Sequence, residues 1–389
     1  MADEKLVPKL RFNGFTDEWS EHKFENIFDI KNGLNKGKDY FGEGIQILNY
    51  MDVNKYELNT ENTIKGLVEL TDDEIERYSV KPNDLFFTRT SETSEEIGLT
   101  SAYMGNTIKC VFSGFLLRAR PKIDVNSLFF AYYLRSPRQR NNIIKFSSIT
   151  TRALISGGNL SKMKIKYPGI EEQNKIANLF LILDKKVELL EKKYREYQCF
   201  KKYLMQKLFA QELRFANFDD DWEIKKLGNI VEFLDNKRIP LNEDERNNQK
   251  DIYPYYGASG IIDYVEDYIF DEELILIGED GTIDVNLASG KYWVSNHAHV
   301  LRANKNINQH YLLEFLKTVH FEIYNTGTIQ PKLNKETCKS IPIKIPESLE
   351  EQKLIANCLF EASNRIKICQ KQIDITNKFK KGLLQQMFI

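Results

Sequence analysis

Cysteine is scarce in this chain, and no two cysteines lie close enough together to form a motif. The 389 residues contain five cysteines and no Cys-x-x-Cys pair. This usage argues against structural zinc or a disulfide framework and is typical of a reducing compartment. No apolar run approaches the ~20 residues of a membrane span, and the first residues lack a signal pattern. We therefore expect a cytoplasmic protein with no membrane segment.

Motifs that bind cofactors are also missing. The chain has no Asn-Pro-Pro-Tyr or Asp-Pro-Pro-Tyr of adenine methyltransferases, no Gly-x-x-x-x-Gly-Lys-Ser/Thr phosphate loop and no Gly-x-Gly-x-x-Gly turn. The glycine-rich turn Gly278–Gly281 lacks the ligand spacing of a calcium hand. His297 and His299 are expected to be structural, with a DNA contact by His297 as the second interpretation. We expect no catalysis, metal or cofactor in this chain.

Two parts of the sequence occur twice. Glu171–Phe209 returns as Glu350–Phe388 at a constant distance of 179 positions, and Leu10–Trp19 returns as Leu213–Trp222, 203 positions away. The segments between these repeats are unlike each other. Such fixed-period similarity predicts two tandem units, each made of a head, a variable body and a long helix.

The longer repeat is predicted to be a helix in both copies. Neither copy contains proline, and apolar residues recur in steps of four and three, which is the seam of a helix packed along another helix. Lys201 and Lys380 interrupt both seams at the same place, where a polar residue can fix the register. The predicted helix–helix seam comprises Ile176, Phe180, Leu183, Val187, Leu190, Ile355, Leu359, Ile366 and Ile373.

The bodies show many short strand patterns separated by glycine and asparagine turns, which predicts mixed α and β structure. Within the first body we expect a helix over Ser127–Lys145, broken near Pro137, followed by a polar loop over Ser147–Gly158. The predicted class is α+β: two mixed α/β domains separated by two long antiparallel coiled-coil helices, as a pseudo-two-fold tandem repeat. The expected boundaries are 1–168 and 212–346 for the two domains, and 169–211 and 347–389 for the helices.

Charge is distributed unevenly along the chain. Residues 118–166 contain 11 Lys and Arg and a single acid, Asp124, whereas residues 1–117 contain 13 basic and 21 acidic residues and residues 213–346 contain 15 and 22. Because the basic segment is interleaved with Phe129, Phe130, Tyr132 and Tyr133, one interpretation is a phosphate-gripping surface. The other is a solvated basic helix face.

The complete layout resembles the specificity (S) subunits of type I restriction-modification enzymes. The resemblance depends on the Leu-Arg-Phe…Trp heads, the Glu-Gln-x-x-Ile-Ala-Asn helix starts, the Phe-Lys-Lys…Leu helix ends, and the loops Pro254–Ala258 and Thr328–Leu333. It covers nearly the full length, and the duplicated order is more specific than any single motif.

The resemblance implies a DNA-binding, non-catalytic subunit in which each body is a target recognition domain for one half of a split site in double-stranded DNA. It further implies that the helices dock two methyltransferase (M) subunits, which use S-adenosylmethionine. Restriction/translocase (R) subunits, which use ATP and Mg, join that core. The acidic second body departs from what independent tight DNA binding would need.

Candidate DNA-binding residues are those whose side chains can present paired donors or acceptors to bases, or cations to phosphates. In the first body they are Lys36, Lys38, Arg89, Ser91, Arg135, Arg138, Arg140 and Arg152. In the second body they are Lys237, Arg238, Tyr255, Tyr256, Ser259, Asn296, Gln330 and Lys332. Tyr255 and Tyr256 can equally belong to the core.

A second class of function stays open from the sequence. A coiled-coil interaction scaffold without DNA readout would show the same helices. The two unlike bodies and the basic segment favour DNA specificity.

Overall fold

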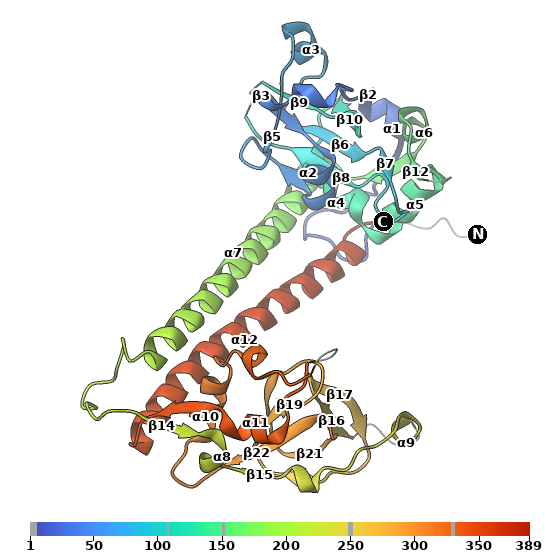
Figure 1. Cartoon of the computed structure of the whole chain (residues 1–389). Helices are drawn as coiled ribbons and strands as arrows, with labels where there is room; N and C mark the ends of the chain where they lie inside the picture. The colour runs from blue at the N-terminus through green and yellow to red at the C-terminus, as the bar shows by residue number, and fades with distance from the viewer. Residues whose placement is uncertain (1–5, 107–108, 150–151, 248–251, 328–330) are drawn as a thin grey trace. The chain divides into compact units, whose positions relative to one another are not determined.

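The computed structural model describes every residue except 1–5, 107–108, 150–151, 248–251 and 328–330. The described residues form two compact units, residues 1–190 with 372–389, and residues 191–371. Two long helices, α7 (Ile170–Phe209) and α12 (Leu349–Gln386), pack together and contribute to both units (Figure 1). We call residues 20–167 the first body and residues 223–345 the second body.

The first body contains two main sheets (Figure 1). The central sheet has the strand order β2-β10-β6-β8-β4, with β2 Phe28–Asn32, β10 Leu116–Pro121, β6 Asp84–Thr88, β8 Thr100–Tyr103 and β4 Leu58–Asn59. The smaller sheet has the order β5-β3-β9, with β5 Gly66–Val68, β3 Phe41–Leu48 and β9 Cys110–Phe112. Short pairs add β1 (Ser20–Lys23) to β13 (Lys164–Tyr167), and β7 (Thr90–Ser91) to β12 (Ala153–Leu154) and β11 (Ser148–Ile149).

The second body follows the same plan. Its central sheet has the order β15-β22-β19-β20, with β15 Val231–Phe233, β22 Ala298–Ala303, β19 Leu274–Gly278 and β20 Val285–Ala288. Its smaller sheet has the order β17-β16-β21-β18, with β17 Gly260–Val265, β16 Tyr253–Gly257, β21 Lys291–Val294 and β18 Phe270–Asp271. In both bodies the middle strand of the central sheet is buried on both faces, and the first and last strands pair (β1 with β13, and β14 Glu223–Lys226 with β23 Pro342–Ile345).

Short helices complete both bodies. In the first they are α1 Phe24–Ile27, α2 Tyr50–Lys55, α3 Asp72–Arg77, α4 Ser127–Arg135, α5 Pro137–Lys145 and α6 Gly157–Ser161, with a 3₁₀ turn η1 Lys38–Tyr40. In the second they are α8 Leu227–Ile230, α9 Glu243–Asn247, α10 Gln309–Leu316 and α11 Lys335–Ser340, with 3₁₀ turns η2 Asp235–Lys237 and η3 Phe321–Tyr324. In the described ranges, no helix is long and apolar enough to cross a membrane.

Two local predictions in the first body have different outcomes. The predicted helix break near Pro137 is confirmed, because α4 ends at Arg135 and α5 begins at Pro137, where a missing N–H is tolerated. The predicted polar loop over Ser147–Gly158 is wrong in part. It contains β11 and β12 and the start of α6, and Ala153 and Ile155 are buried in the core.

The repeated heads and helix starts form the same contact in each unit. The Arg11 guanidinium donates to both carboxylate oxygens of Glu172, each at 2.8 Å, and Arg214 donates to Glu351 at 2.8 and 3.1 Å. Both carboxylates are buried, and two-point Arg–carboxylate pairing is strong and directional. The repeated residues therefore form a joint in each unit. This joint connects the head to the long helix that follows the body of the same unit.

The glutamine that follows each of these glutamates connects the long helix to the body by hydrogen bonds. The side-chain oxygen of Gln173 accepts from the Asn126 backbone N–H at 3.0 Å, and that of Gln352 accepts from Asn308 N–H at 2.7 Å. Each side-chain amide donates to a proline carbonyl directly before the helix. These bonds satisfy backbone groups that burial would otherwise leave without water.

Within the first unit, the end of α12 packs against the start of α7 and against the first body. The Phe388 ring lies 5.6 Å from that of Phe180 and 5.6 Å from that of Phe129. About two turns earlier, Lys380 forms an ion pair with Asp184 and lies 3.4 Å from Glu57. Burial would raise the pKa of Glu57, but Arg135 and Lys380 outweigh it, so this pKa lies below its usual value.

Within the second unit, the end of α7 takes the corresponding place on the second body. Phe209 lies 5.7 Å from Tyr311 and 5.2 Å from Phe315, and Lys201 forms a 2.7 Å ion pair with the buried Glu314. Leu204 and Leu208 share a core with residues at the start of α12: Ile355, Ala356 and Leu359. Each unit thus joins the end of one helix to the start of the other, so the helices run antiparallel.

The predicted seam residues lie on the inner face of the helices. All nine are buried or half-buried. Lys201 and Lys380 break the seam because both face carboxylates, which accounts for their common position in the repeat. The expected boundaries at 168, 211 and 346 stay predictions, although α7 and α12 begin and end within a few residues of them.

A half-chain tests whether each body needs the end of a second long helix. We predict that residues 1–212 form a symmetric homodimer, through a seam that includes Ile176, Leu183, Val187 and Leu190. In it, Lys201 and Phe209 of each copy would take the places that Lys380 and Phe388 hold on the first body. Sedimentation should give twice the mass of the half-chain.

The charge of Lys201 provides the control. Lys201→Glu in the half-chain would place a carboxylate against Asp184 and Glu57 and should weaken the dimer, whereas Lys202→Glu, at an exposed neighbour, should not. A monomeric half-chain, or equal dimerisation of both variants, would contradict this description of the joint.

Candidate nucleic-acid interface

Four segments meet at one end of the central strands in the first body. They are residues 32–36 at and after the end of β2, 89–91 after β6, 113–115 in the turn that connects β9 of the smaller sheet to β10 of the central sheet, and 153–155 before α6. We call the connecting turn the tip. Backbone bonds connect the four segments: Arg89 N–H donates to Phe115 O at 2.8 Å, Ile155 N–H to Arg89 O at 3.0 Å, and Gly114 N–H to Leu34 O at 2.6 Å. We call this the first edge.

The second body has an equivalent edge, made of residues 235–238, 279–281, 295–297 and 331–333. Glu279 N–H donates to His297 O at 2.8 Å, and Leu333 N–H donates to Glu279 O at 2.8 Å. The strand registers agree, since Gly278 lies opposite Ala298 as Thr88 lies opposite Leu116. Glu279 therefore occupies the place of Arg89, and His297 the place of Phe115.

The tips, 113–115 between β9 and β10 and 295–297 between β21 and β22, are held in the same way in both bodies. Ser113 Oγ accepts from Phe115 N–H at 3.3 Å, and Ser295 Oγ accepts from His297 N–H at 3.2 Å. Ser113 N–H donates to Leu48 O, and Ser295 N–H donates to Tyr256 O, which ties each tip to the smaller sheet. The two bodies therefore share these hydrogen bonds, whereas the side chains on the two edges differ.

A charged cluster stabilises the second edge. Arg238 donates to Glu279 at 2.9 Å and to the Asn296 and Ala298 carbonyls at 3.1 and 2.8 Å. The fully buried His299 has Nδ1 2.9 Å from Asp235 and donates from Nε2 to Leu333 O at 2.8 Å. Burial would raise the pKa of Asp235, but bonds from His299 and Val300 N–H outweigh it, so the pKa lies below its usual value.

The predicted histidine roles can now be assigned in part. His299 is structural, as expected, because both ring nitrogens are engaged inside the body. His297 is exposed at the tip between β21 and β22. In the described part of the chain, no group of three His, Cys, Asp or Glu residues could hold a metal ion.

Several predicted first-body residues lie at or beside the first edge. Lys36 forms a 2.7 Å pair with Glu74, and Lys38 is exposed. Arg89 is half-buried and lines a cavity of about 470 Å³ beside Asn32 and Gly157.

Two further candidates are in the same region. Ser91 is buried, and its hydroxyl lies 3.4 Å from the carboxylate of Glu96. Arg152 is exposed and lies 3.7 Å from Glu92.

Arg135 and Arg140 are directed into their own body. Arg135 donates to the carbonyls of Thr100 at 2.7 Å and Asn54 at 3.1 Å, and also to Val53 O. Arg140 donates to Glu95 O at 3.0 Å and to Ile97 O. Burial lowers the pKa of both guanidinium groups, that of Arg140 to about 10. These contacts are structural.

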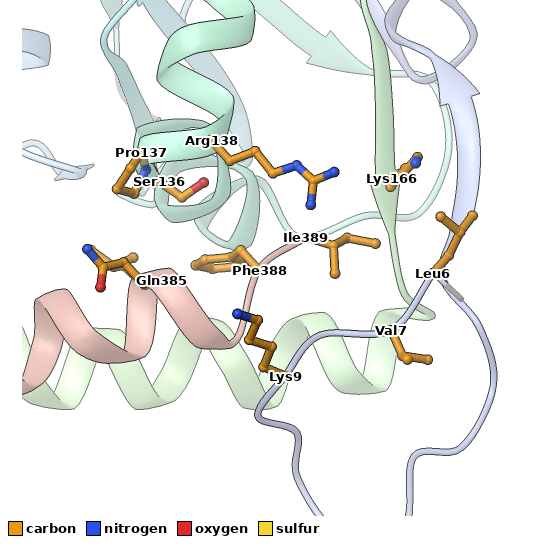
Figure 2. A pocket seen from close by; sticks show the side chains of 11 residues that line it. Leu6, Val7, Lys9, Ser136, Pro137, Arg138, Lys166, Gln385, Phe388 and Ile389 are labelled. Atoms are coloured by element: carbon orange, nitrogen blue, oxygen red, sulfur yellow. The ribbon is translucent and has the colours of Figure 1, made fainter. Parts of the chain in front are cut away.

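The interpretation of residues 118–146 as a phosphate-gripping aromatic surface is wrong for the aromatic residues of α4. Phe129, Phe130, Tyr132 and Tyr133 are at most 1% exposed and form the core. Arg138 is exposed, and Figure 2 shows it reaching from the start of α5 into a pocket of about 400 Å³ whose lining contains no residue of the first edge. That pocket is shared with the chain's first and last described segments, including Lys9 and Phe388.

Second-body candidates also divide into exposed and inward groups. Lys237, Ser259 and Asn296 are exposed, and Lys332 is exposed with its amine 3.2 Å from Asp280. Tyr255 is buried, with its hydroxyl accepting from Leu241 N–H, and Tyr256 is half-buried against Tyr292. Gln330 lies outside the described residues.

The sequence did not reveal Phe115 or Glu279 as edge residues. A signal was present, because Ser113-Gly114-Phe115 and Ser295-Asn296-His297 both end on a ring residue two positions after serine. Without the strand registers, the two triplets could not be aligned.

Comparison with known proteins decides the family. The model of the type I restriction modification DNA specificity domain matches residues 16–196 and 219–377, that is, most of both units. The chain belongs to this family of specificity subunits. Its role is therefore DNA specificity in a type I restriction-modification system, without catalysis of its own.

Individual relatives agree with this assignment. A putative type I restriction enzyme MjaX specificity subunit from Methanocaldococcus jannaschii is 26% identical, with 98% of this chain and 95% of the relative covered. The EcoprrI specificity subunit of Escherichia coli is 29% identical over 38% of either chain. The crystal structure of the S subunit from M. genitalium has the same fold, with a TM-score of 0.67, 17% identity and coverage of 98% and 99%.

The contrast between Arg135 and Arg138 yields a stability prediction. Arg135→Ala in this specificity subunit removes a buried cation, takes this donor from several carbonyls and leaves Glu57 with Lys380 alone, so it should lower the free energy of unfolding by roughly 3–5 kcal/mol. Arg138→Ala, at an exposed site, should change it by less than about 0.5 kcal/mol. Chemical unfolding measures both, and equal effects would contradict the structural role of Arg135.

Proposed function

We propose that the two bodies each read one half of a split site in double-stranded DNA, through the first and second edges. The observation that carries this is the pair of edges: the same backbone bonds hold them, whereas the side chains on them differ. Arg89 is matched by Glu279, and Gly114 by Asn296. A shared frame with different donors and acceptors suits the reading of two different sequences.

Polar side chains in the edges and near them in sequence suit different tasks. Lys38, Lys237 and Lys332 suit phosphate contact, which positions the protein, and Lys36 joins them if its pair with Glu74 opens. Arg152, Ser259, Asn296 and Gln330 suit base contact. Arg135, Arg140, Arg238, His299 and Tyr255 would act by holding the loops in place.

We further propose that the helices dock methyltransferase subunits. Both helices expose large apolar side chains away from the seam, and we call these the outer stripes: Ile182, Leu189, Phe200 and Tyr203 on α7, and Phe360, Ile368, Ile375 and Phe379 on α12. Leu189 and Ile368, like Phe200 and Phe379, are related by the 179-residue repeat. Exposed apolar stripes favour a protein partner, and two like stripes favour two copies of one partner.

The rest of the assembly follows from the family. S-adenosylmethionine would be bound by the methyltransferase subunits, and ATP with Mg by restriction/translocase subunits that join them. The location would be cytoplasmic. Because residues 213–346 carry a net negative charge, tight DNA binding would need the partner's cations as well.

An exchange of bodies tests the proposal. Replacing residues 12–166 by the corresponding segment of another specificity subunit should change one half of the methylated site and leave the other half intact. The readout is the mapping of methylated adenines in cells that also carry the methyltransferase subunit. A change in both halves would show that the readout is shared between the bodies, against the proposal.

Charged substitutions test the outer stripes. Leu189→Glu or Ile368→Glu should each reduce capture from two methyltransferase subunits per chain to about one, and together they should abolish it. The control is Arg195→Glu, which adds an exposed carboxylate about 120° round α7 from Leu189. Co-sedimentation measures binding, and unimpaired capture by the double variant would exclude the stripes as the docking surfaces.

A further inference from the structure

One residue at each tip, the turn that connects the smaller sheet to the central sheet, combines a fixed backbone with an exposed ring. Phe115 is 60% exposed, and the side chain of His297 is 55% exposed. Each has its N–H held by the serine two positions earlier and its carbonyl held by the residue after the buried middle strand. These hydrogen bonds fix the position from which each ring projects out of the body, and the ring itself takes no part in them.

The exposure of Phe115 is costly and local packing does not account for it. Apolar side chains gain free energy by burial, and the neighbouring Phe112, Leu116 and Leu117 are all fully buried. The equivalent position in the second body carries a polar ring instead. At this position the backbone hydrogen bonds are the same in both bodies, while the side chain is apolar in one and polar in the other. Such a position is suited to reading a variable partner.

Cationic segments lie directly beside both tips. An added Cβ on Gly114 would lie 2.0 Å from the Asn35 side-chain oxygen, so the segment that leads into Lys36 and Lys38 touches the first tip. In the second body, Arg238 donates to Asn296 O, and Lys237 precedes it. Each ring therefore stands next to groups that can hold a phosphate backbone.

We propose that Phe115 and His297 are equivalent base-contacting residues, one for each half-site. Phe115 has no polar atom, so it would contact an apolar base edge such as the thymine methyl group. His297 has Nδ1 3.4 Å from Asp280 Oδ2, which directs Nε2 away from the body and toward a base edge. This inference rests on the proposed function, that each body reads one half-site.

The test uses the full chain in complex with its methyltransferase subunit. Phe115→Ala and His297→Ala are compared with the wild-type complex on DNA duplexes randomised in one half-site at a time, and methylation and binding are both measured. We expect Phe115→Ala to reduce discrimination by roughly tenfold at one or two base pairs of the first body's half-site. The other half-site should be unchanged, and His297→Ala should give the opposite pattern.

Matched controls separate a contact from a folding effect. Ile123→Ala removes a 48% exposed apolar side chain just beyond the opposite end of β10, and His320→Ala removes an exposed histidine outside the second edge. Both should keep wild-type discrimination. All four variants should keep the wild-type melting temperature, and Phe115→Leu, which keeps an apolar side chain, should recover part of the discrimination.

The outcomes distinguish this inference from the proposal beneath it. Wild-type discrimination in both alanine variants, or loss in both half-sites from either one, would overturn the inference and leave the bodies as readers. A wild-type complex that discriminates in neither half-site would overturn the proposed function itself.

Discussion

Each body is held between the start of the helix that follows it and the end of the other helix. Phe388 fills this place in the first unit and Phe209 in the second, 179 residues apart in a sequence that repeats without a gap. The Arg11–Glu172 and Arg214–Glu351 pairs close the same joint from the head side. Because both ends of both helices are used in this way, neither helix can change length or register without separating a body from its support.

The joints permit the bodies to diverge. In each joint, residues of the repeated head and of the two long helices contact short helices and loops of the body. The far ends of the central strands are therefore free of that constraint. There, backbone hydrogen bonds preserve the form of the edge, while one side chain differs in sign between the bodies: Arg89 in the first, and Glu279, paired with Arg238, in the second. This division between a fixed joint and a variable edge is the physical basis for two different specificities in one chain.

The sequence predicted the parts of the molecule that depend on local pattern. The two long helices and the break before Pro137 follow from residue spacing and proline chemistry. The structural role of His299 was also expected. The roles of Arg135 and Arg140 were not, because the carbonyls that they bind lie up to about 80 positions away in the chain.

The residues of the first and second edges show the same limit of prediction from sequence more clearly. Among the predicted DNA-binding residues, Lys38, Asn296 and Lys332 are exposed, whereas Tyr255 and Arg238 face inward, and composition alone does not distinguish the two groups. DNA contact by the exposed residues stays a prediction. Phe115 escaped notice because a phenylalanine between two strands suggests core. Only the register of β6 with β10, and of β19 with β22, aligns it with His297.

The most direct test of the account is the sequence that the natural complex methylates. Methylated adenines should be mapped across the genome of cells that carry this chain with its methyltransferase subunit. The account predicts one site made of two short defined sequences, unlike each other and separated by a fixed number of unspecified bases. A single continuous target, or methylation without sequence preference, would contradict it.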